Sequence, residues 1–550
     1  MKKKNTVRWI WRVSGRKKGY VLALTLVQGI AGVIGVIYAL LFRAVVDSAV
    51  GKNATAFRHN VVLIIGLVLV QLAVSAVIRW LNELARSDIE NTFKQRLVDN
   101  ILQKDYASVT ATHTAEWLNR LTNDTTVVAG GTVEILPGLV GTVVRLISAL
   151  ILIIALDRWF AYILIPGGIA LVILTYAFRG VLKRLHKNIQ ESDGRLRVFL
   201  QERISSLMVI KAFTAEQQTG DGAAQAMAGH KAARLRRNRF SNVANIGFGA
   251  AMQGMYLIGV VYCAHGIMTG RVTYGTLTAI MQLIGQVQGP FANISGYLPR
   301  WYAMTASAER LMEIEGYEDD GKVADRETMH HYYEHDFNVL GLQNASFSYK
   351  PTGEEEMPVV LEGLDLEIHK GETVAFTGHS GCGKSTVLKL LMCLYPLDGG
   401  ERFIDDQPLT AYHRRLFAYV PQGNTLMNGT IKEVVCFAEP YVENRLKRAL
   451  TISCADEFVD DVSTELGERG SGLSEGQMQR LAIARAIYAD APILLLDEST
   501  SALDEATEQR LLQNFRSMTD KTVVIVTHRK AALSICDRVL RFTETGVVEV

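Results

Sequence analysis

The chain has 550 residues, which is too long for one ordinary domain, so two or more domains are expected. Its 58 Lys and Arg residues nearly balance its 56 Asp and Glu residues, and the resulting formal charge of +2 gives no general case for nucleic-acid binding. The six cysteines lack the CxxC spacing of metal sites, which indicates free thiols in a reducing compartment.

The first half of the chain carries six apolar segments, each close to the roughly 20 helical residues that cross a bilayer. A single segment could be a buried core helix, but six in succession with hairpin-length gaps on one side predict a multi-pass membrane domain. The first segment is long and shows no small-residue cleavage site, so it is expected to be an anchor rather than a removable signal peptide. The six expected spans are 20–42, 61–80, 139–156, 160–178, 243–267 and 274–298.

Basic residues predict the orientation of these spans. The start, MKKKNTVRWIWRVSGRKK, and the stretch KAARLRRNRF at 231–240 are strongly positive, whereas the connections on the other side carry few basic residues. Positive charge marks the cytoplasmic side, so both termini are expected inside an inner or plasma membrane. The cytoplasmic connections 81–138 and 179–242 are polar but contain few helix breakers. They are therefore expected to be membrane helices that continue into the cytoplasm, turn and return.

A few polar side chains within the spans suggest a substrate pathway. Arg145 is the one charge well inside a span, and it suits an anionic substrate or a structural pairing about equally. Gln282, Gln286 and Asn293 share one helical face with Gly289 in the last span. That stripe fits a wet translocation cavity, or alternatively hydrogen bonding between helices.

The second half contains a phosphate-binding loop. In VAFTGHSGCGKST (374–386) an apolar strand leads into GxxxxGKS at Gly378–Ser385, and an apolar helix follows. Small residues allow successive backbone N–H groups to face phosphates above a helix N-terminus, which favours negative charge. Lys384 is expected to reach the β- and γ-phosphates, and the Ser385 hydroxyl to ligate Mg²⁺.

Two later strands end in residues suited to hydrolysis. ILLLDEST (493–500) is an apolar strand that ends in Asp497, a candidate Mg²⁺ partner, and Glu498, positioned to polarise an attacking water. TVVIVTHR (522–529) is another apolar strand and delivers His528, a candidate γ-phosphate contact. Between the loop and these strands, SGLSEGQMQRLAIARAI (471–487) has a glycine-rich start and carries Ser474, Gly476 and Gln477 just ahead of a helix, which suggests a second phosphate-binding surface.

Together these residues resemble the ATP-binding cassette transporters, and the resemblance extends over essentially the whole chain. Gly378–Thr386 is similar to the Walker A loop, and Asp497 with Glu498 to Walker B and its catalytic glutamate. The stretch at 471–487 resembles the signature motif, usually LSGGQ, and His528 the switch histidine. Further similarities are Gln422 of YVPQ to the Q-loop glutamine, SALD (501–504) to the D-loop, Tyr349 of SFSY to the adenine-stacking aromatic, and TELGERG (464–470) to an exporter loop that touches the membrane domain.

The resemblance implies roles for individual residues, with ATP and Mg²⁺ as cofactors. Glu498, His528 and Gln422 are implied to be catalytic, and Ser385, Gln422 and Asp497 to hold the metal. Contacts with nucleotide are implied for Tyr349, Gly378, Ser380, Gly381, Gly383, Lys384, Ser385, Thr386, Ser474, Gly476, Gln477 and Asp504.

The implied architecture is an exporter-type half-transporter, in which an all-α six-helix transmembrane domain precedes an α/β P-loop NTPase domain. The expected boundaries are 1–312 for the transmembrane domain, 313–336 for a linker and 337–550 for the nucleotide-binding domain. In the membrane half, 194–218 resembles the second intracellular loop, and 115–125 the segment after the first coupling helix. By the same analogy, short helices near 106–113 and 202–213 should contact the cassettes, and the fourth and fifth membrane helices should be domain-swapped.

One cassette per chain implies a dimer, because in this family each ATP lies between the phosphate loop of one cassette and the signature of the other. A homodimer is slightly favoured, and a heterodimer stays open. Two residues depart from the usual motifs. Glu475 replaces a glycine of the signature, where its charge would repel phosphate unless it points away or meets a basic neighbour. Cys382 lies inside the phosphate loop, where it serves as a small filler.

The leading functional hypothesis is ATP-driven export of an amphipathic small molecule, lipid, drug or peptide by alternating access. An importer of a siderophore-like metabolite with the exporter fold is the alternative. An ATP-gated channel or regulatory ATPase is disfavoured by the intact hydrolytic residues. A peptide-processing exporter is also not expected, since no cysteine-protease domain precedes the spans.

Overall fold

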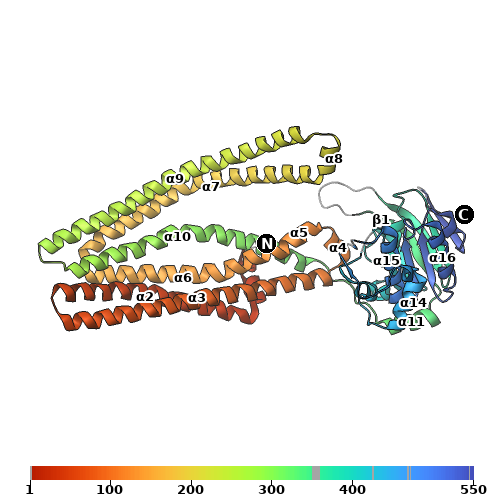
Figure 1. Cartoon of the computed structure of the whole chain (residues 1–550), viewed down its shortest axis with the longest axis horizontal. Helices are drawn as coiled ribbons and strands as arrows, with labels where there is room; N and C mark the ends of the chain where they lie inside the picture. Colours follow the sequence, from red (N-terminus) through yellow and green to blue (C-terminus); the bar gives the residue numbers. More distant parts are fainter. Residues whose placement is uncertain (1–2, 350–358, 424–425, 468–469, 471, 544–545) are drawn as a thin grey trace. The chain divides into compact units, whose positions relative to one another are not determined.

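The computed structural model describes residues 3–349, 359–423, 426–467, 470, 472–543 and 546–550. The side chains of 3–4, 161, 163–165, 168–179, 182–183, 186 and 288–295 lie outside the described part. The chain divides into two compact units (Figure 1). One comprises Met1–Arg96 and Arg120–Met312, and the other Leu97–Asn119 and Glu313–Val550.

The first unit consists of helices, several of them very long (Figure 1). The helix from Ala54 to Gln103 has 50 residues, or roughly 75 Å of helix rise, against about 30 Å of hydrocarbon. The expected continuation of membrane helices into residues 81–103, 179–205 and 216–242 is therefore observed. The helices are α1 (Lys3–Ser14), α2 (Lys18–Val50), α3 (Ala54–Gln103), α6 (Thr125–Leu156), α7 (Arg158–Ser205), α8 (Leu207–Ala212), α9 (Glu216–Met268) and α10 (Tyr274–Glu313), with a π-helix at Arg120–Asp124.

Within the described residues, four stretches are long and apolar enough to cross a membrane: Asn5–Val50, Ala54–Gln103, Thr114–Leu156 and Glu216–Met268. Each contains one expected span, namely 20–42, 61–80, 139–156 and 243–267. The other two expected spans, 160–178 and 274–298, lie in α7 and α10 and fall partly outside the described residues. The most apolar window of α3 has no buried residue, so these helices expose apolar surface that suits lipid rather than water.

The polar residues of the expected spans are placed as follows. On α10, Gln286 donates through Nε2 to the Gly35 carbonyl of α2 at 2.5 Å, which supports the helix–helix interpretation of this residue. Gln282 is half-buried, and Asn293 and Gly289 lie outside the described part. Arg145 is exposed on α6 within this unit.

A buried carboxylate joins two helical segments of the first unit. Asp124 is fully buried and accepts hydrogen bonds from Ser307 Oγ and Arg310 Nε of α10, both at 2.8 Å. These contacts join α10 to the start of α6. Because the charge of Asp124 is paired and hydrogen-bonded, its burial is tolerated.

The second unit is α/β. A six-stranded sheet has the order β12-β11-β3-β10-β9-β6, a four-stranded antiparallel sheet has the order β2-β1-β4-β5, and β7 pairs with β8. The strands are β1 (Val339–Phe347), β2 (Leu361–His369), β3 (Thr373–Thr377), β4 (Gly399–Ile404), β5 (Gln407–Pro408), β6 (Phe417–Val420), β7 (Gly429–Thr430), β8 (Glu465–Leu466), β9 (Ile493–Asp497), β10 (Thr522–Val526), β11 (Arg538–Thr543) and β12 (Gly546–Glu549). The helices are α4 (Tyr106–Thr110), α5 (Thr114–Asn119), α11 (Arg326–His335), α12 (Lys384–Leu391), α13 (Ile431–Cys436), α14 (Glu443–Ile452), α15 (Glu475–Ala489), α16 (Glu505–Arg516) and α17 (Lys530–Leu533).

The order of the larger sheet determines where the functional residues gather. The central strands β9 and β10 are buried along their whole length, as expected for continuous apolar runs in a parallel sheet. Strands β11, β3, β10, β9 and β6 are mutually parallel. Their carboxyl ends therefore share one edge of the sheet, which is where ligands bind in open α/β sheets.

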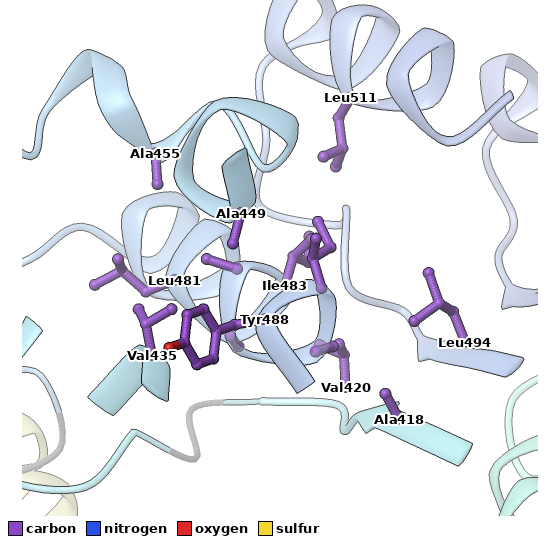
Figure 2. Packing of buried hydrophobic residues seen from close by; sticks show 14 of the residues in the cluster. Ala418, Val420, Val435, Ala449, Ala455, Leu481, Ile483, Tyr488, Leu494 and Leu511 are labelled. Carbon is purple, nitrogen blue, oxygen red and sulfur yellow. The ribbon is translucent and has the colours of Figure 1, made fainter. Parts of the chain in front are cut away.

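Helix α15 is the centre of one hydrophobic core of this unit (Figure 2). Its residues Leu481, Ile483 and Tyr488 pack in a cluster that also contains Val420 of β6 and Leu494 of β9. Figure 2 shows these side chains converging around the helix. The packing anchors the glycine-rich stretch that precedes α15 to the same sheet as the phosphate loop.

The second unit also includes residues 97–119, which the expected boundaries assigned to the transmembrane domain. The rings of Tyr106 on α4 and Tyr395 lie 5.5 Å apart in an edge-to-face arrangement. Lys104 forms an ion pair with Asp319 at 2.7 Å. The short helix α4 thus packs against the α/β domain, as anticipated for a helix near 106–113. The second anticipated helix, α8, belongs to the first unit.

Candidate functional site

The phosphate loop follows β3 directly and leads into α12. Gly378 adopts φ 138°, and a Cβ at this position would lie 2.6 Å from the Phe542 carbonyl oxygen, so glycine is required here. Lys384 is buried, and its Nζ donates to the carbonyls of Gly378 (2.8 Å) and His379 (2.9 Å). The ammonium therefore lies inside the curve of the loop. Four other loop residues are expected to contact nucleotide. Ser380 and Gly381 are exposed, whereas Gly383 and Thr386 are buried.

An oxygen pair suited to Mg²⁺ lies next to the loop. Ser385 Oγ donates to Asp497 Oδ1 at 2.8 Å, joining α12 to the end of β9. The other carboxylate oxygen, Oδ2, accepts from the hydroxyl of Tyr419 at 3.1 Å. Burial raises the pKa of Asp497, and the charge of Glu498 adds to the rise, while the hydrogen bonds from Ser385 and Tyr419 oppose it. Hydroxyl and carboxylate oxygens are ligands that Mg²⁺ prefers, so Ser385 and Asp497 fit the expected metal.

Glu498 lies between the two other residues expected to be catalytic. Gln422 Nε2 donates to Glu498 Oε2 at 2.7 Å, and His528 Nε2 is 4.0 Å from Glu498 Oε1. Glu498 adopts φ 48°, an uncommon left-handed conformation for a residue with a side chain. Its N–H donates to the Val526 carbonyl at the end of β10, which holds the strained backbone in place. Strain of this kind clusters at functional sites.

The glycine-rich stretch becomes helical earlier than the sequence suggests. Helix α15 begins at Glu475, so Gly476 and Gln477 lie in its first turn rather than ahead of it. Ser474 is the N-cap, and its Oγ accepts from Gln477 N at 3.2 Å while Gln477 Oε1 accepts from Ser474 N at 2.8 Å. This reciprocal capping box defines the start of the helix. Glu475 is exposed in the first turn, where the helix dipole favours a carboxylate.

The loop at 501–504 is connected to the start of α15 by contacts that the sequence did not predict. Gln479 donates through Nε2 to Ser501 Oγ at 3.0 Å, and its Oε1 accepts from Ala502 N at 3.1 Å. Arg529 donates to the carbonyls of Ser501 (2.6 Å) and Leu503 (3.0 Å). Asp504 is the N-cap of α16. In the sequence, only the position of Arg529 directly after His528 suggested that Arg529 lies near the site.

Tyr349, expected to stack on adenine, follows β1 near the phosphate loop. Its hydroxyl lies 3.1 Å from Thr386 Oγ1 of α12. Its ring makes edge-to-face contacts with Phe347, at 4.9 Å between centroids, and with Tyr395, at 5.3 Å. The adjoining residues 350–358 lie outside the described part, as do 468–469 of the expected TELGERG loop.

Cys382 provides a free thiol in the phosphate loop that can be labelled chemically. Its side chain is partly exposed, and Sγ lies 3.6 Å from Lys384 Nζ. A bulky maleimide on this thiol is expected to abolish nucleotide binding, because the adduct would fill the loop that cradles the phosphates. Prior addition of ATP should protect, and Cys382→Ala should remove the sensitivity. Binding of a fluorescent ATP analogue before and after labelling measures this, and inhibition that persists in Cys382→Ala would implicate a different thiol.

Two family models match the chain. Residues 21–291 match the model described as the ABC transporter transmembrane region, and residues 361–501 match the model described as ABC transporter. A solved structure described as a bacterial Atm1-family ABC exporter with ATP bound superposes with a TM-score of 0.77. The match covers 98% of this chain and 95% of that one at 21% identity. The expected fold class, a helical membrane domain followed by an α/β ATPase domain, is thereby confirmed.

Curated relatives include leukotoxin translocation ATP-binding proteins named LktB. The protein from Pasteurella haemolytica-like sp. (strain 5943B) is 31% identical over 366 residues, which are 64% of this chain and 50% of that protein. The protein from Mannheimia glucosida is 30% identical over 382 residues, 67% of this chain and 52% of that protein. This chain therefore spans about half the length of the curated relatives that it matches.

Proposed function

The chain belongs to the ATP-binding cassette transporter family, and from that premise we propose that it is one half of a dimeric exporter of an amphipathic compound. The observation that carries the proposal is the convergence of Ser385, Asp497, Gln422, Glu498 and His528 at one edge of the six-stranded sheet. The apolar helices of the first unit are long enough to cross a membrane, and ATP hydrolysis would drive transport of the substrate between them.

Each residue of the candidate site has a separate role in the proposed hydrolysis of ATP. Lys384 and the backbone of the phosphate loop would bind the β- and γ-phosphates, and Ser385 and Asp497 would hold Mg²⁺. The metal would supply positive charge that offsets the charge of the phosphate oxygens. Glu498 orients and polarises the attacking water as general base. Gln422, which donates to Glu498 Oε2, keeps that carboxylate turned into the site, and His528 is placed to contact the γ-phosphate.

Two cassettes are needed for one complete site. Ser474, Gly476 and Gln477 at the start of α15 supply the surface that closes over the nucleotide bound by a second cassette, with Asp504 of the adjoining loop. The second cassette belongs to another copy of this chain or to a paralogous half-transporter. ATP-driven closure of the pair opens the membrane helices outward, and hydrolysis resets them.

The distribution of basic residues supports a cytoplasmic position for both termini and for the ATPase domain, on the side of the membrane that supplies ATP. Relatives named as leukotoxin translocation proteins support export as the direction of transport.

Transport into inside-out vesicles tests the proposal directly. Vesicles that contain the native chain should accumulate an exported compound when ATP is added, and vesicles that contain Glu498→Gln should not. The comparison is made with a panel of labelled amphipathic compounds and with membranes of matched protein content. ATP-driven loss of a compound from preloaded inside-out vesicles would instead establish import and overturn the assigned direction.

A further inference from the structure

Tyr419 contacts the expected metal-binding carboxylate from a neighbouring strand. It lies on β6, which pairs in parallel with β9 so that Tyr419 is opposite Leu495. Side chains alternate along a strand, so Asp497, two residues after Leu495, is on the same face of the sheet as Tyr419. The long phenol spans the remaining distance, and its hydroxyl donates to Asp497 Oδ2 at 3.1 Å.

The two oxygens of Asp497 therefore have different partners. Oδ1 accepts from Ser385 Oγ, and Oδ2 accepts from Tyr419. A carboxylate rotates readily about the last torsion of its side chain. A hydrogen-bond donor on one oxygen therefore fixes the plane of the group and the direction in which the other oxygen points. Asp497 is only 1% exposed, so bulk water cannot replace a missing donor at Oδ2.

We propose that Tyr419 is a positioning residue for the metal site, which fixes the rotation of the Asp497 carboxylate so that Oδ1 is presented beside Ser385 Oγ. The inference rests on the proposed function, because it takes Ser385 and Asp497 as the residues that hold Mg²⁺. Groups that hydrogen-bond to metal-binding carboxylates orient them and raise the affinity for the metal. Tyr419 acts through Asp497 and does not touch the nucleotide.

The surroundings of Tyr419 suit a positioning role. Its ring packs against a buried cluster that includes Phe376, Val387 and Leu495, with Tyr349 and Tyr395 beside the same cluster. A rigid phenol held by packing on one side therefore directs a single hydrogen bond at the carboxylate.

Tyr419→Phe tests the proposal, because it removes the hydroxyl and keeps the ring. The measurement is binding of trinitrophenyl-ATP as free Mg²⁺ is titrated, in the Glu498→Gln background so that no hydrolysis interferes. The Mg²⁺ concentration for half-maximal metal-dependent binding should rise about 10-fold. Binding in EDTA, and binding at excess Mg²⁺, should equal those of the protein with Tyr419 intact.

Tyr488→Phe is the matched control. It also removes a buried phenol hydroxyl, one that donates to the Pro440 carbonyl at 2.5 Å and accepts from Val442 N at 2.8 Å, in the other hydrophobic core. This variant should leave the Mg²⁺ dependence unchanged.

Each result decides a separate point. An unchanged Mg²⁺ dependence in Tyr419→Phe, or an equal shift in Tyr488→Phe, would overturn the positioning role. So would a loss of binding in Tyr419→Phe that excess Mg²⁺ does not restore, because the defect would then lie in the nucleotide pocket itself. Absence of nucleotide binding in the protein with Tyr419 intact would contradict the proposed function instead.

Discussion

Replacement of Glu498 by glutamine should lower ATP turnover by a factor between about 10² and 10⁴, the range that a general base contributes. The amide cannot accept a proton from the attacking water, yet its oxygen can still accept the hydrogen bond from Gln422 Nε2. The exchange therefore removes basicity and leaves the geometry of the site in place. Release of inorganic phosphate measures turnover, and binding of trinitrophenyl-ATP should stay close to that of the native chain.

The same substitution at Glu505 provides the control. Glu505 is an exposed glutamate in the first turn of α16, seven residues further along the chain. Glu505→Gln should hydrolyse ATP at the native rate. Native turnover by Glu498→Gln would show that another group activates the water, with His528 the next candidate because its Nε2 lies 4.0 Å from Glu498 Oε1.

The parts of the candidate site that the sequence predicted best are those whose local structure depends on neighbouring residues. The phosphate loop between β3 and α12 is one continuous stretch, and its glycines and Lys384 make the turn recognisable from the sequence alone. Asp497 and Glu498 were likewise recognisable because an apolar run of buried-strand length ends directly before them. In both cases the strand, the turn and the functional side chain are neighbours in the sequence.

Contacts between distant segments were not predictable in this way. The hydrogen bonds that Asp497 receives from Tyr419 and that Glu498 receives from Gln422 cross 78 and 76 residues, respectively. They depend on β6 lying beside β9, an order that no hydrophobic pattern encodes. The placement of residues 97–119 in the second unit was missed for a related reason. A helix as long as α3 carries no signal for the point at which its packing partner changes.

The start of α15 illustrates how a motif can be recognised while its local structure is misread. Glycines near Ser474 suggested a loop that continued to Gln477. The serine and glutamine instead form a capping box, so the helix begins at Glu475. A Cβ at Gly476 would lie 2.8 Å from the Ala502 carbonyl oxygen. The glycine is therefore explained within one chain by close approach of the loop at 501–504, in addition to any contact with a nucleotide.

The proposed pairing of two cassettes around each nucleotide can be tested with two variants, Lys384→Ala and Gly476→Asp. Lys384→Ala removes the ammonium from the phosphate loop, and Gly476→Asp adds a charge and bulk to the surface that closes on the partner's nucleotide. Each variant alone should lose at least ~100-fold of the ATPase rate in a dimer of identical chains, since both sites are damaged. Mixed dimers are isolated by two different affinity tags.

A mixed dimer of the two single variants should recover about half of the native rate, because one of its two sites joins an intact phosphate loop to an intact signature surface. The double variant paired with a native chain should be inactive, since each of its two sites then contains one lesion. Both mixed dimers contain the same two substitutions, so differences in expression or folding cannot account for opposite results. If each chain closed its own site, the double variant paired with a native chain would be the active one, and the head-to-tail arrangement would be wrong.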